Sequence, residues 1–324
     1  MAVRVASLSQ ALETSVNTLF LSHPVALLHE MGEGHPERPE RLRAIEQALE
    51  VEAFQTLSRD RAKPVRREAI LRVHPEAYVA ALEAAVPASG YAELDGDTTM
   101  CPRTLDAASM AAGAACQAVD EIMAGHVDNV FVAMRPPGHH AERATAMGFC
   151  FFNSAAIAAR HAQAVHGIDR VAIIDFDVHH GNGTQDIFWA DPTVMYCSTH
   201  QMPLYPGTGA VSERGEHDNI VNAPLRAGDG GEAFKAAMTE RILPRLESFG
   251  PDLVIISAGF DAHRRDPLAN LNLVEDDFGW ATGKLMEVAD RRAGGRLVSL
   301  LEGGYDLRGL SSSVAVHVRR LMGA

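Results

Sequence analysis

The sequence predicts an α/β protein with a central, mostly parallel sheet and helices on both faces. Several apolar runs are nearly continuous, such as VAII at 171–174 and LVIIS at 253–257, as expected for strands covered on both sides. Helical patterns separate these runs, and polar clusters directly follow several of them. Alternating strands and helices favour parallel pairing, because each helix carries the chain back to the start of the next strand.

The predicted elements follow one another along a single domain, residues 1–324. The predicted strands are Thr18–Ser22, Asn129–Met134, Arg170–Asp175, Thr193–Ser198, Leu253–Ser257 and Arg296–Leu301. The predicted helices, each ending within two residues of a glycine, are Arg103–Ala124, Ser154–Val165, Glu232–Phe249 and Glu275–Ala293. Residues 199–230, which contain YPGTGA and RAGDGG, are expected to form a long irregular segment of the kind that is often functional.

The chain is acidic and rich in histidine. Its 324 residues include 29 Lys and Arg, 42 Asp and Glu and 15 His, which gives a net charge of −13. This charge argues against direct nucleic-acid binding, and many histidines beside many carboxylates favour a metal or acid–base site. No run is apolar enough to span a membrane, and the segment MAVRVASLSQALETSVNTLFLSHP lacks a signal-peptide pattern. We expect a cytoplasmic protein whose scattered cysteines are buried and reduced, namely Cys101, Cys116, Cys150 and Cys197.

Four polar clusters come directly after four predicted strands. Their sequences are RPPGHH at 135–140, DFDVHHGNG at 175–183, AGFD at 258–261 and EGGY at 302–305. In open parallel sheets, ligands bind beyond the carboxyl ends of the strands. We therefore expect all four clusters to converge at one edge of the sheet.

The second and third clusters predict a metal site. Asp175, Asp177 and His179 alternate along the chain, and on an extended segment alternate side chains share one face. For an isolated D-x-H, a strand-end Asp that accepts backbone hydrogen bonds would be an equally good interpretation. With Asp261 at the end of another strand, we predict that Asp177, His179 and Asp261 bind a metal ion. Three protein ligands leave a position for water, as in catalytic zinc sites, where the pKa of that water falls toward about 7.

The adjacent histidines His139 and His140 are predicted to act in acid–base chemistry because they lie at the same edge, although such a pair in a loop is usually solvated. Each imidazole needs a partner to set its tautomer, and Asp175 and Asn182 are the available candidates. A carboxylate raises the pKa of a histidine, whereas an amide adds no charge, so the histidine beside Asn182 is the better general base.

Three aromatic residues are further candidates. Tyr305 follows two glycines that let the backbone turn toward the site, where its hydroxyl could polarise a carbonyl; a half-buried ring is the alternative. Phe149 and Tyr205 could wall a narrow slot, although ordinary packing is the simpler interpretation. The sequence has no P-loop, strand-linked G-x-G-x-x-G or G-x-S-x-G motif, which leaves metal-assisted hydrolysis as the leading function.

These residues lie in segments that closely resemble the zinc-dependent histone deacetylase family. The segments are RPPGHHA, GFCFFN, DFDVHHGNGTQDIF, SAGFDAHRRDP and LEGGY, and GHPERPERLRAI resembles the class II branch. The resemblance covers about residues 20–310 and extends to bacterial histone deacetylase-like amidohydrolases. It implies the single-domain arginase–deacetylase fold and a deacetylase that hydrolyses the ε-N-acetyl amide of acetyl-lysine in proteins or peptides.

The resemblance also implies a role for each matching residue. The zinc ligands would be Asp177, His179 and Asp261, and the catalytic residues would be His139, His140, Asp175, Asn182 and Tyr305. The acyl-lysine channel would include Phe149, Gly148, Tyr205 (where Phe is usual), Leu268 and, more loosely, Asp97. Structural K⁺ is implied near Asp175, Asp177, His179 and Ser198, and often at a second site near Phe188 and Val194. In the implied mechanism, zinc-activated water attacks the acetyl carbonyl, His140 transfers the proton to the departing amine, and His139 acts mainly electrostatically.

Three other functions are alternatives to an acetyl-lysine deacetylase. The related ureohydrolases bridge two manganese ions with a D-x-H-x-D pattern, but Gly181 stands where that second carboxylate is needed. Acetylpolyamine hydrolases carry a Glu after the D-P of the corresponding loop, where this chain has Leu268, so acetyl-lysine is favoured over an acetylated small amine. A non-catalytic acetyl-lysine reader would be expected to lack a metal ligand, His140 or Tyr305. Oligomerisation is open.

Overall fold

In a computed structural model that describes residues 16–324, an eight-stranded sheet forms the centre of the molecule. Its order is β2-β1-β5-β10-β9-β6-β7-β8, and every pair in it is parallel. The strands are β1 (Thr18–Ser22), β2 (Ser58–Arg61), β5 (Asn129–Val132), β6 (Val171–Asp175), β7 (Val194–Gln201), β8 (Ile220–Leu225), β9 (Leu253–Ala258) and β10 (Leu297–Leu301). A separate antiparallel pair consists of β3 (Ala92–Glu93) and β4 (Thr99–Met100).

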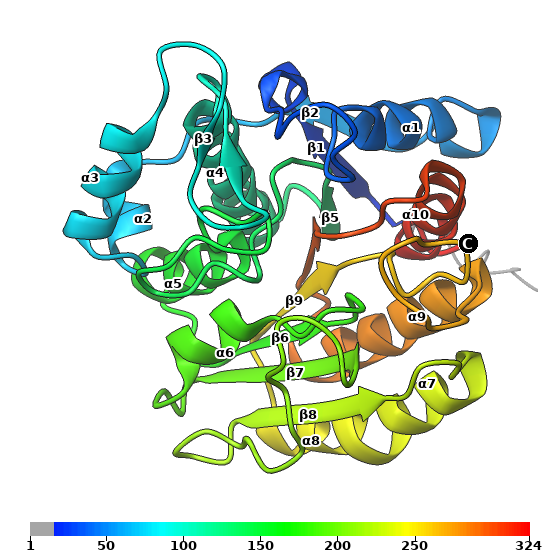
Figure 1. Cartoon of the computed structure of the whole chain (residues 1–324). Coiled ribbons are helices and arrows are strands. Elements are labelled where there is room, and N and C mark those ends of the chain that lie inside the picture. Colours follow the sequence, from blue (N-terminus) through cyan, green and yellow to red (C-terminus); the bar gives the residue numbers. More distant parts are fainter. Residues whose placement is uncertain (1–15) are drawn as a thin grey trace, which may run out of the picture.

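Helices cover both faces of the sheet, as Figure 1 shows. On one face, α4 (Thr104–Met123) and α5 (Ser154–His166) pack against each other. On the other, α10 (Leu307–Leu321) packs between α1 (Glu40–Ala48) and α9 (Glu275–Arg292). The remaining helices are α2 (Arg67–Leu71), α3 (Glu76–Ala85), α6 (Asn182–Phe188), α7 (Gly231–Ala237) and α8 (Leu243–Phe249). There are also 3₁₀ turns at Pro24–Leu28 and Glu52–Phe54.

The six predicted strands are present within a few residues of their predicted bounds, and the structure adds the two edge strands. β2 has the sequence SRDR and is largely exposed, so it has no apolar pattern to detect. β8 has the sequence IVNAPL, and Pro224 fits there because a strand at the edge can dispense with one N–H donor. The expectation of an irregular segment over 199–230 is therefore wrong for Ile220–Leu225, and β7 also extends to Gln201.

The four predicted helices are also present. The one predicted at Glu232–Phe249 contains a π-helical turn at Met238–Ile242, where the hydrogen-bonding pattern adjusts just before Pro244. Proline lacks an N–H and crowds the carbonyl of the preceding turn, which explains the local irregularity. Helices α1, α2, α3, α6 and α10 were not predicted; four of them have ten residues or fewer, and α10 contains a serine run.

The core lies between the sheet and its two helical layers. All four cysteines are buried and free, as predicted. No helix among the described residues is long and apolar enough to cross a membrane. Residues 1–15, which include most of the N-terminal segment considered above, lie outside the described part of the chain.

Candidate active site

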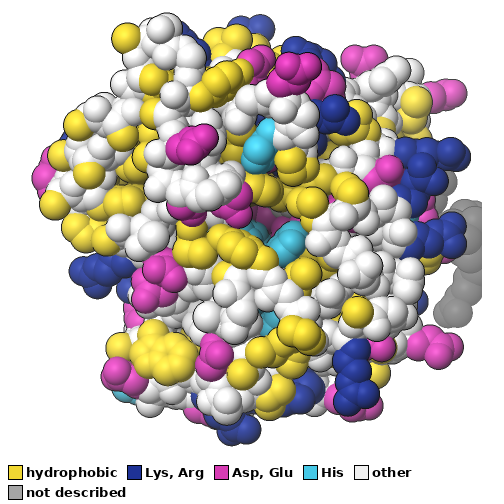
Figure 2. All heavy atoms as spheres, viewed as in Figure 1, with side chains coloured by type: hydrophobic (Ala, Val, Ile, Leu, Met, Phe, Trp, Pro, Cys, Tyr) yellow, Lys and Arg dark blue, Asp and Glu magenta, His cyan; other side chains and the backbone are white. Residues whose placement is uncertain are grey.

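The four polar clusters converge at one edge of the sheet, as predicted. They follow β5, β10, β9 and β6, which are neighbours in the middle of the sheet. Because these strands are parallel, their carboxyl ends meet at the same edge. Figure 2 shows a hollow near the centre of this face, with histidine and acidic side chains inside it and hydrophobic side chains around it. The sheet topology thus gathers residues that are far apart in sequence.

Asp177, His179 and Asp261 form a buried group, here named the metal-ligand cluster. The Nδ1 atom of His179 lies 3.2 Å from Oδ1 of Asp177 and 3.1 Å from Oδ2 of Asp261. The chain leaves the strand at Asp175, so strand alternation does not align these side chains, contrary to the prediction. Instead, Asp177 accepts the backbone N–H of His179 at 2.9 Å, in a turn that directs both side chains to one point.

The metal-ligand cluster fits a tetrahedral metal ion. Ligand atoms about 2.0–2.1 Å from zinc lie roughly 3.3 Å apart, close to the two separations at His179. Burial lowers the pKa of His179, but its contacts with both carboxylates outweigh this effect and raise the pKa to about 10. The two carboxylates that raise this pKa would equally favour a divalent cation at the same point. A Cβ at Gly303 would clash with Asp177 and Asp261, so close packing at this point requires glycine.

His139 is paired with a carboxylate. Its Nδ1 atom lies 2.9 Å from Oδ2 of Asp175, and both side chains are buried. Burial lowers the pKa of His139, but the charges of Asp175 and Asp177 outweigh burial and raise the pKa well above its ordinary value. His139 is therefore suited to remain protonated and to supply positive charge.

His140 is paired with an amide. Its Nδ1 atom lies 2.8 Å from Oδ1 of Asn182, and its ring centre is 4.1 Å from that of His139. Burial and the positive charges of His139 and His179 hold the pKa of His140 well below its ordinary value. The amide of Asn182 donates to Glu142 at 2.8 Å, which keeps its oxygen toward His140. His140 thus carries its proton on Nδ1 and presents an unprotonated Nε2 atom.

Tyr305 is buried beside these residues. Its backbone N–H donates to Oδ2 of Asp266 at 2.7 Å, and Gly304 before it has φ +122°, a conformation that favours glycine. Burial raises the pKa of Tyr305 well above its ordinary value, although Arg41 opposes the effect. The phenol therefore keeps its proton and can donate a hydrogen bond.

The predicted channel residues surround the same point. Phe149 packs edge-on against Tyr305 with ring centres 5.9 Å apart, and Tyr205 packs edge-on against His140 at 5.1 Å. A Cβ at Gly148 would overlap the His140 ring, so the backbone there lies directly over the imidazole. Phe149 has φ +69°, a strained conformation held in part by its N–H donating to the hydroxyl of Thr98 at 3.1 Å.

The remaining channel candidates, Asp97 and Leu268, lie on separate loops. Asp97 is half-buried, and its carbonyl accepts from Nε2 of His35, whose ring packs edge-on against Phe149. Leu268 is half-buried and donates its N–H to Oδ1 of Asp266 at 3.0 Å. Since the other oxygen of Asp266 holds the backbone of Tyr305, the loop that carries Leu268 is tied to the site.

The residues implied for potassium fall in two places. Asp175 and Ser198 are paired on β6 and β7, beside the metal-ligand cluster, so the residues implied for the first ion are neighbours. The carbonyls of Phe188 and Val194 both accept from Nδ2 of Asn219, at 2.9 and 3.0 Å. Each carbonyl oxygen has a second lone pair, so this hydrogen bond leaves the oxygens of both residues able to contact a cation.

Two residues without a predicted role also hold the site together. Glu302 accepts the backbone N–H of His139 at 3.1 Å. Arg41 lies 4.9 Å from the ring centre of Tyr305 and donates to the carbonyl of Gly304 at 2.6 Å. Both residues belong to segments that carry the family resemblance, LEGGY and GHPERPERLRAI, but their contacts depend on long-range folding that the spacing does not reveal.

Comparison with known proteins agrees with this geometry. The histone deacetylase domain family matches residues 35–321. The chain is 42% identical to histone deacetylase 14, chloroplastic, of Arabidopsis thaliana, over 94% of this chain and 77% of that protein. It is 42% identical to a histone deacetylase-like amidohydrolase of Pseudomonas aeruginosa, over 84% of this chain and 73% of that protein. The crystal structure of the HDA15 HD domain superposes with a TM-score of 0.90 at 37% identity, over 95% of this chain and 88% of that one. The chain therefore belongs to the histone deacetylase family, whose relatives support deacetylase activity.

Proposed function

We propose that this protein is a zinc-dependent hydrolase of the N-acetyl amide of acetyl-lysine in proteins or peptides. The observation that carries the proposal is the contrast between His139, bonded to Asp175, and His140, bonded to Asn182, at the edge of the metal-ligand cluster. The charged form is favoured for His139 and the neutral form for His140, and two groups with separated pKa values suit acid–base catalysis of amide hydrolysis.

The residues divide the reaction among them. Zinc bound by Asp177, His179 and Asp261 would supply Lewis acidity toward the attacking water and the acetyl carbonyl. Nε2 of His140 accepts a proton from the attacking water and then donates it to the departing amine, since its low pKa leaves it unprotonated before attack.

Two further groups act on charge that develops during the reaction. The hydroxyl of Tyr305 donates a hydrogen bond to the carbonyl oxygen as negative charge builds there. The positive charge of His139 stabilises the same transition state through space, because Asp175 occupies its Nδ1 atom. Buried potassium near Asp175 and Ser198 would be structural.

The channel supports an acyl-lysine substrate. Phe149 and Tyr205 present aromatic edges near the catalytic residues, and such a slot suits an alkyl chain that carries a terminal amide. Leu268 offers no charge to the secondary ammonium of an acetylated polyamine. The net charge of −13 favours lysine-rich tails over nucleic acid as binding partners.

A substrate panel tests the proposal. Acetyl-lysine peptides, longer acyl-lysine peptides and acetylated polyamines are each incubated with the enzyme, with and without a chelator. We expect the acetyl-lysine peptides to be hydrolysed fastest and the chelator to stop the reaction. Binding of acetyl peptides without turnover would support a reader instead, and preference for acetylated polyamines would favour polyamine hydrolysis.

A further inference from the structure

A second group of metal-binding side chains lies outside the active site. Asp120 of α4 and two residues of α5, His161 and His166, place their ligand atoms within 4.8 Å of one another. This trio is named the α4–α5 cluster. Nε2 of His161 and Nε2 of His166 each lie 2.7 Å from the same oxygen of Asp120, Oδ1. The two ring centres are 5.7 Å apart. The packing of α4 against α5 thus brings two imidazoles and one carboxylate to a single point.

This cluster is remote from the site described above. Asp120 is 16 residues from the start of α4 at Thr104, a distance of about 24 Å along the helix. His166 is the last residue of α5, whose first residue, Ser154, follows the segment that contains Phe149. The cluster therefore lies at the far ends of both helices.

One oxygen of Asp120 is shared by both imidazoles of the α4–α5 cluster. The Nε2 atoms of His161 and His166 therefore already face a common carboxylate oxygen, and a metal ion would take the place of the protons that they share with it. The hydrogen bonds from His161 and His166 outweigh burial and hold the pKa of Asp120 below its ordinary value, which keeps the carboxylate charged.

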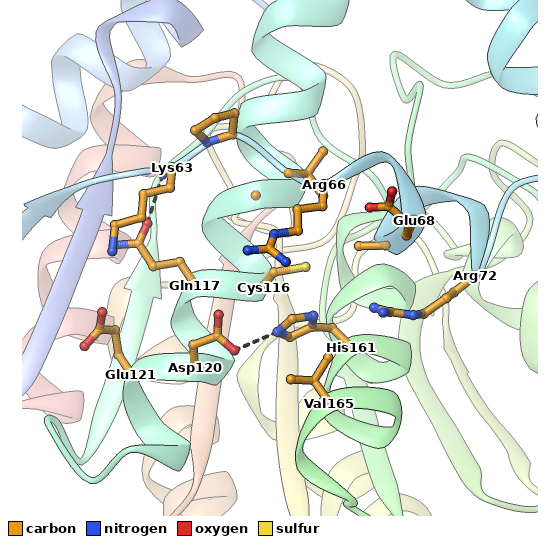
Figure 3. Close-up of a pocket in the computed structure, with 14 residues that line it drawn as sticks. Lys63, Arg66, Glu68, Arg72, Cys116, Gln117, Asp120, Glu121, His161 and Val165 are labelled. Carbon is orange, nitrogen blue, oxygen red and sulfur yellow. Dashed lines mark hydrogen bonds and ion pairs between the residues drawn. The ribbon is translucent and has the colours of Figure 1, made fainter.

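The surroundings leave room for a metal ion and a solvent ligand. Asp120 and His161 lie on the wall of a cavity of about 560 Å³, and Figure 3 shows them beside each other there. The Asp120 side chain is 50% exposed, so it can rotate to widen the present 2.7 Å separations to the roughly 3.3 Å typical of zinc ligands. The charged residues on the cavity wall balance, and water would supply the fourth ligand; the basic ones are Lys63, Arg66 and Arg72, and the acidic ones are Glu68, Asp120 and Glu121.

We propose that the α4–α5 cluster binds one divalent transition-metal ion, separate from the metal of the active site. Imidazole nitrogen together with carboxylate oxygen suits zinc and its neighbours in the first transition row, whereas Mg²⁺ prefers oxygen ligands. The ion would connect Asp120 of α4 to His161 and His166 of α5. Binding would therefore stabilise the packing of the two helices by mass action.

Equilibrium dialysis against Zn²⁺ tests the proposal by the number of ions bound per chain. We expect His161→Ala and His166→Ala each to bind one zinc ion fewer than the unaltered protein. His126→Ala is the matched control, because His126 bonds to Glu121 nearby without joining the cluster, and it should bind the full number. Equal zinc binding by the unaltered protein and His166→Ala would overturn the proposal. Dialysis against Mg²⁺ should show no difference among these proteins.

A thermal measurement separates this site from the active-site metal. In an Asp261→Ala background, Zn²⁺ should still raise Tm, and the further change His166→Ala should abolish that rise. If Zn²⁺ raises Tm equally in both proteins, the cluster does not bind it. Without metal, the Asp261→Ala protein and the double variant should have closely similar Tm values and circular dichroism spectra. That result would show that His166→Ala preserves the fold. Because the comparison uses a disabled active site, its result does not depend on the proposed deacetylase function.

Discussion

The Nδ1 atom of His140 lies 2.8 Å from the amide oxygen of Asn182, whereas the neighbouring His139 is bonded to a carboxylate. This difference in partner sets the two imidazoles apart in charge. In the proposed mechanism, His140 therefore transfers the proton and His139 provides electrostatic stabilisation.

Replacing each histidine in turn tests that assignment. His140→Ala should lower kcat by about 10²–10⁴-fold, the usual contribution of a general base, and His139→Ala should lower it less. Steady-state kinetics on an acetyl-lysine peptide measures both. The reverse ranking would assign proton transfer to His139.

Tyr305→Phe removes the hydroxyl that, in the proposed mechanism, donates to the carbonyl oxygen as charge develops on it. We expect kcat to fall about 10²–10³-fold with little change in KM, as when one oxyanion donor is removed. Tyr91→Phe is the control: it removes the same phenolic hydroxyl from an exposed tyrosine, and it should leave kcat unchanged. A change in KM alone would contradict the assigned role of Tyr305.

Leu268→Glu places a carboxylate on the loop tied to Tyr305 through Asp266. An exposed ion pair contributes up to about 1 kcal/mol, so kcat/KM for an acetylated polyamine should rise roughly fivefold relative to an acetyl-lysine peptide. Competition between the two substrates measures this ratio. An unchanged ratio would show that Leu268 does not set selectivity.

His317 makes stability sensitive to acid. It is buried between Thr282 and Ser299, and burial lowers its pKa from 6.5 to about 3. Because the pKa is lower in the folded state, neutral His317 contributes to the free energy of unfolding above pH 6.5, and this contribution is lost as the pH falls toward 3. One such group removes about 2 kcal/mol of the free energy of unfolding between pH 6.5 and pH 5.

Urea unfolding at pH 7 and pH 5 checks the effect. The fall in the free energy of unfolding should be about 2 kcal/mol smaller in His317→Gln than in the unaltered protein. The exposed His217 supplies a control, and His217→Gln should leave the fall unchanged. An equal fall in all three proteins would show that His317 does not carry the acid sensitivity.

The sequence predicts the central strands and the convergence of the site well, because both depend on local patterns and one topological rule. VAII and LVIIS identify buried strands, and the polar residues that follow them must meet at the carboxyl edge of a parallel sheet. The edge strands β2 and β8 escape prediction because charge and proline replace the apolar pattern there.

Contacts between distant segments are harder to predict. Arg41 reaches Gly304 across 263 residues, and nothing in its local sequence indicates that partner. The turn that brings Asp177 to His179 likewise depends on a hydrogen bond from the backbone N–H of His179 to the Asp177 carboxylate rather than on strand alternation. The residue types of the site are readable from the sequence, but the hydrogen bonds that orient them require the fold.

In the proposed function, Asp177, His179 and Asp261 hold the metal on which hydrolysis depends. Asp261→Ala removes one ligand, and metal content and turnover of an acetyl-lysine peptide are measured on the same sample. We predict that the active-site metal and the activity are lost together, while the zinc of the α4–α5 cluster remains. Full activity in a variant that binds no metal at the active site would contradict the dependence of hydrolysis on that metal.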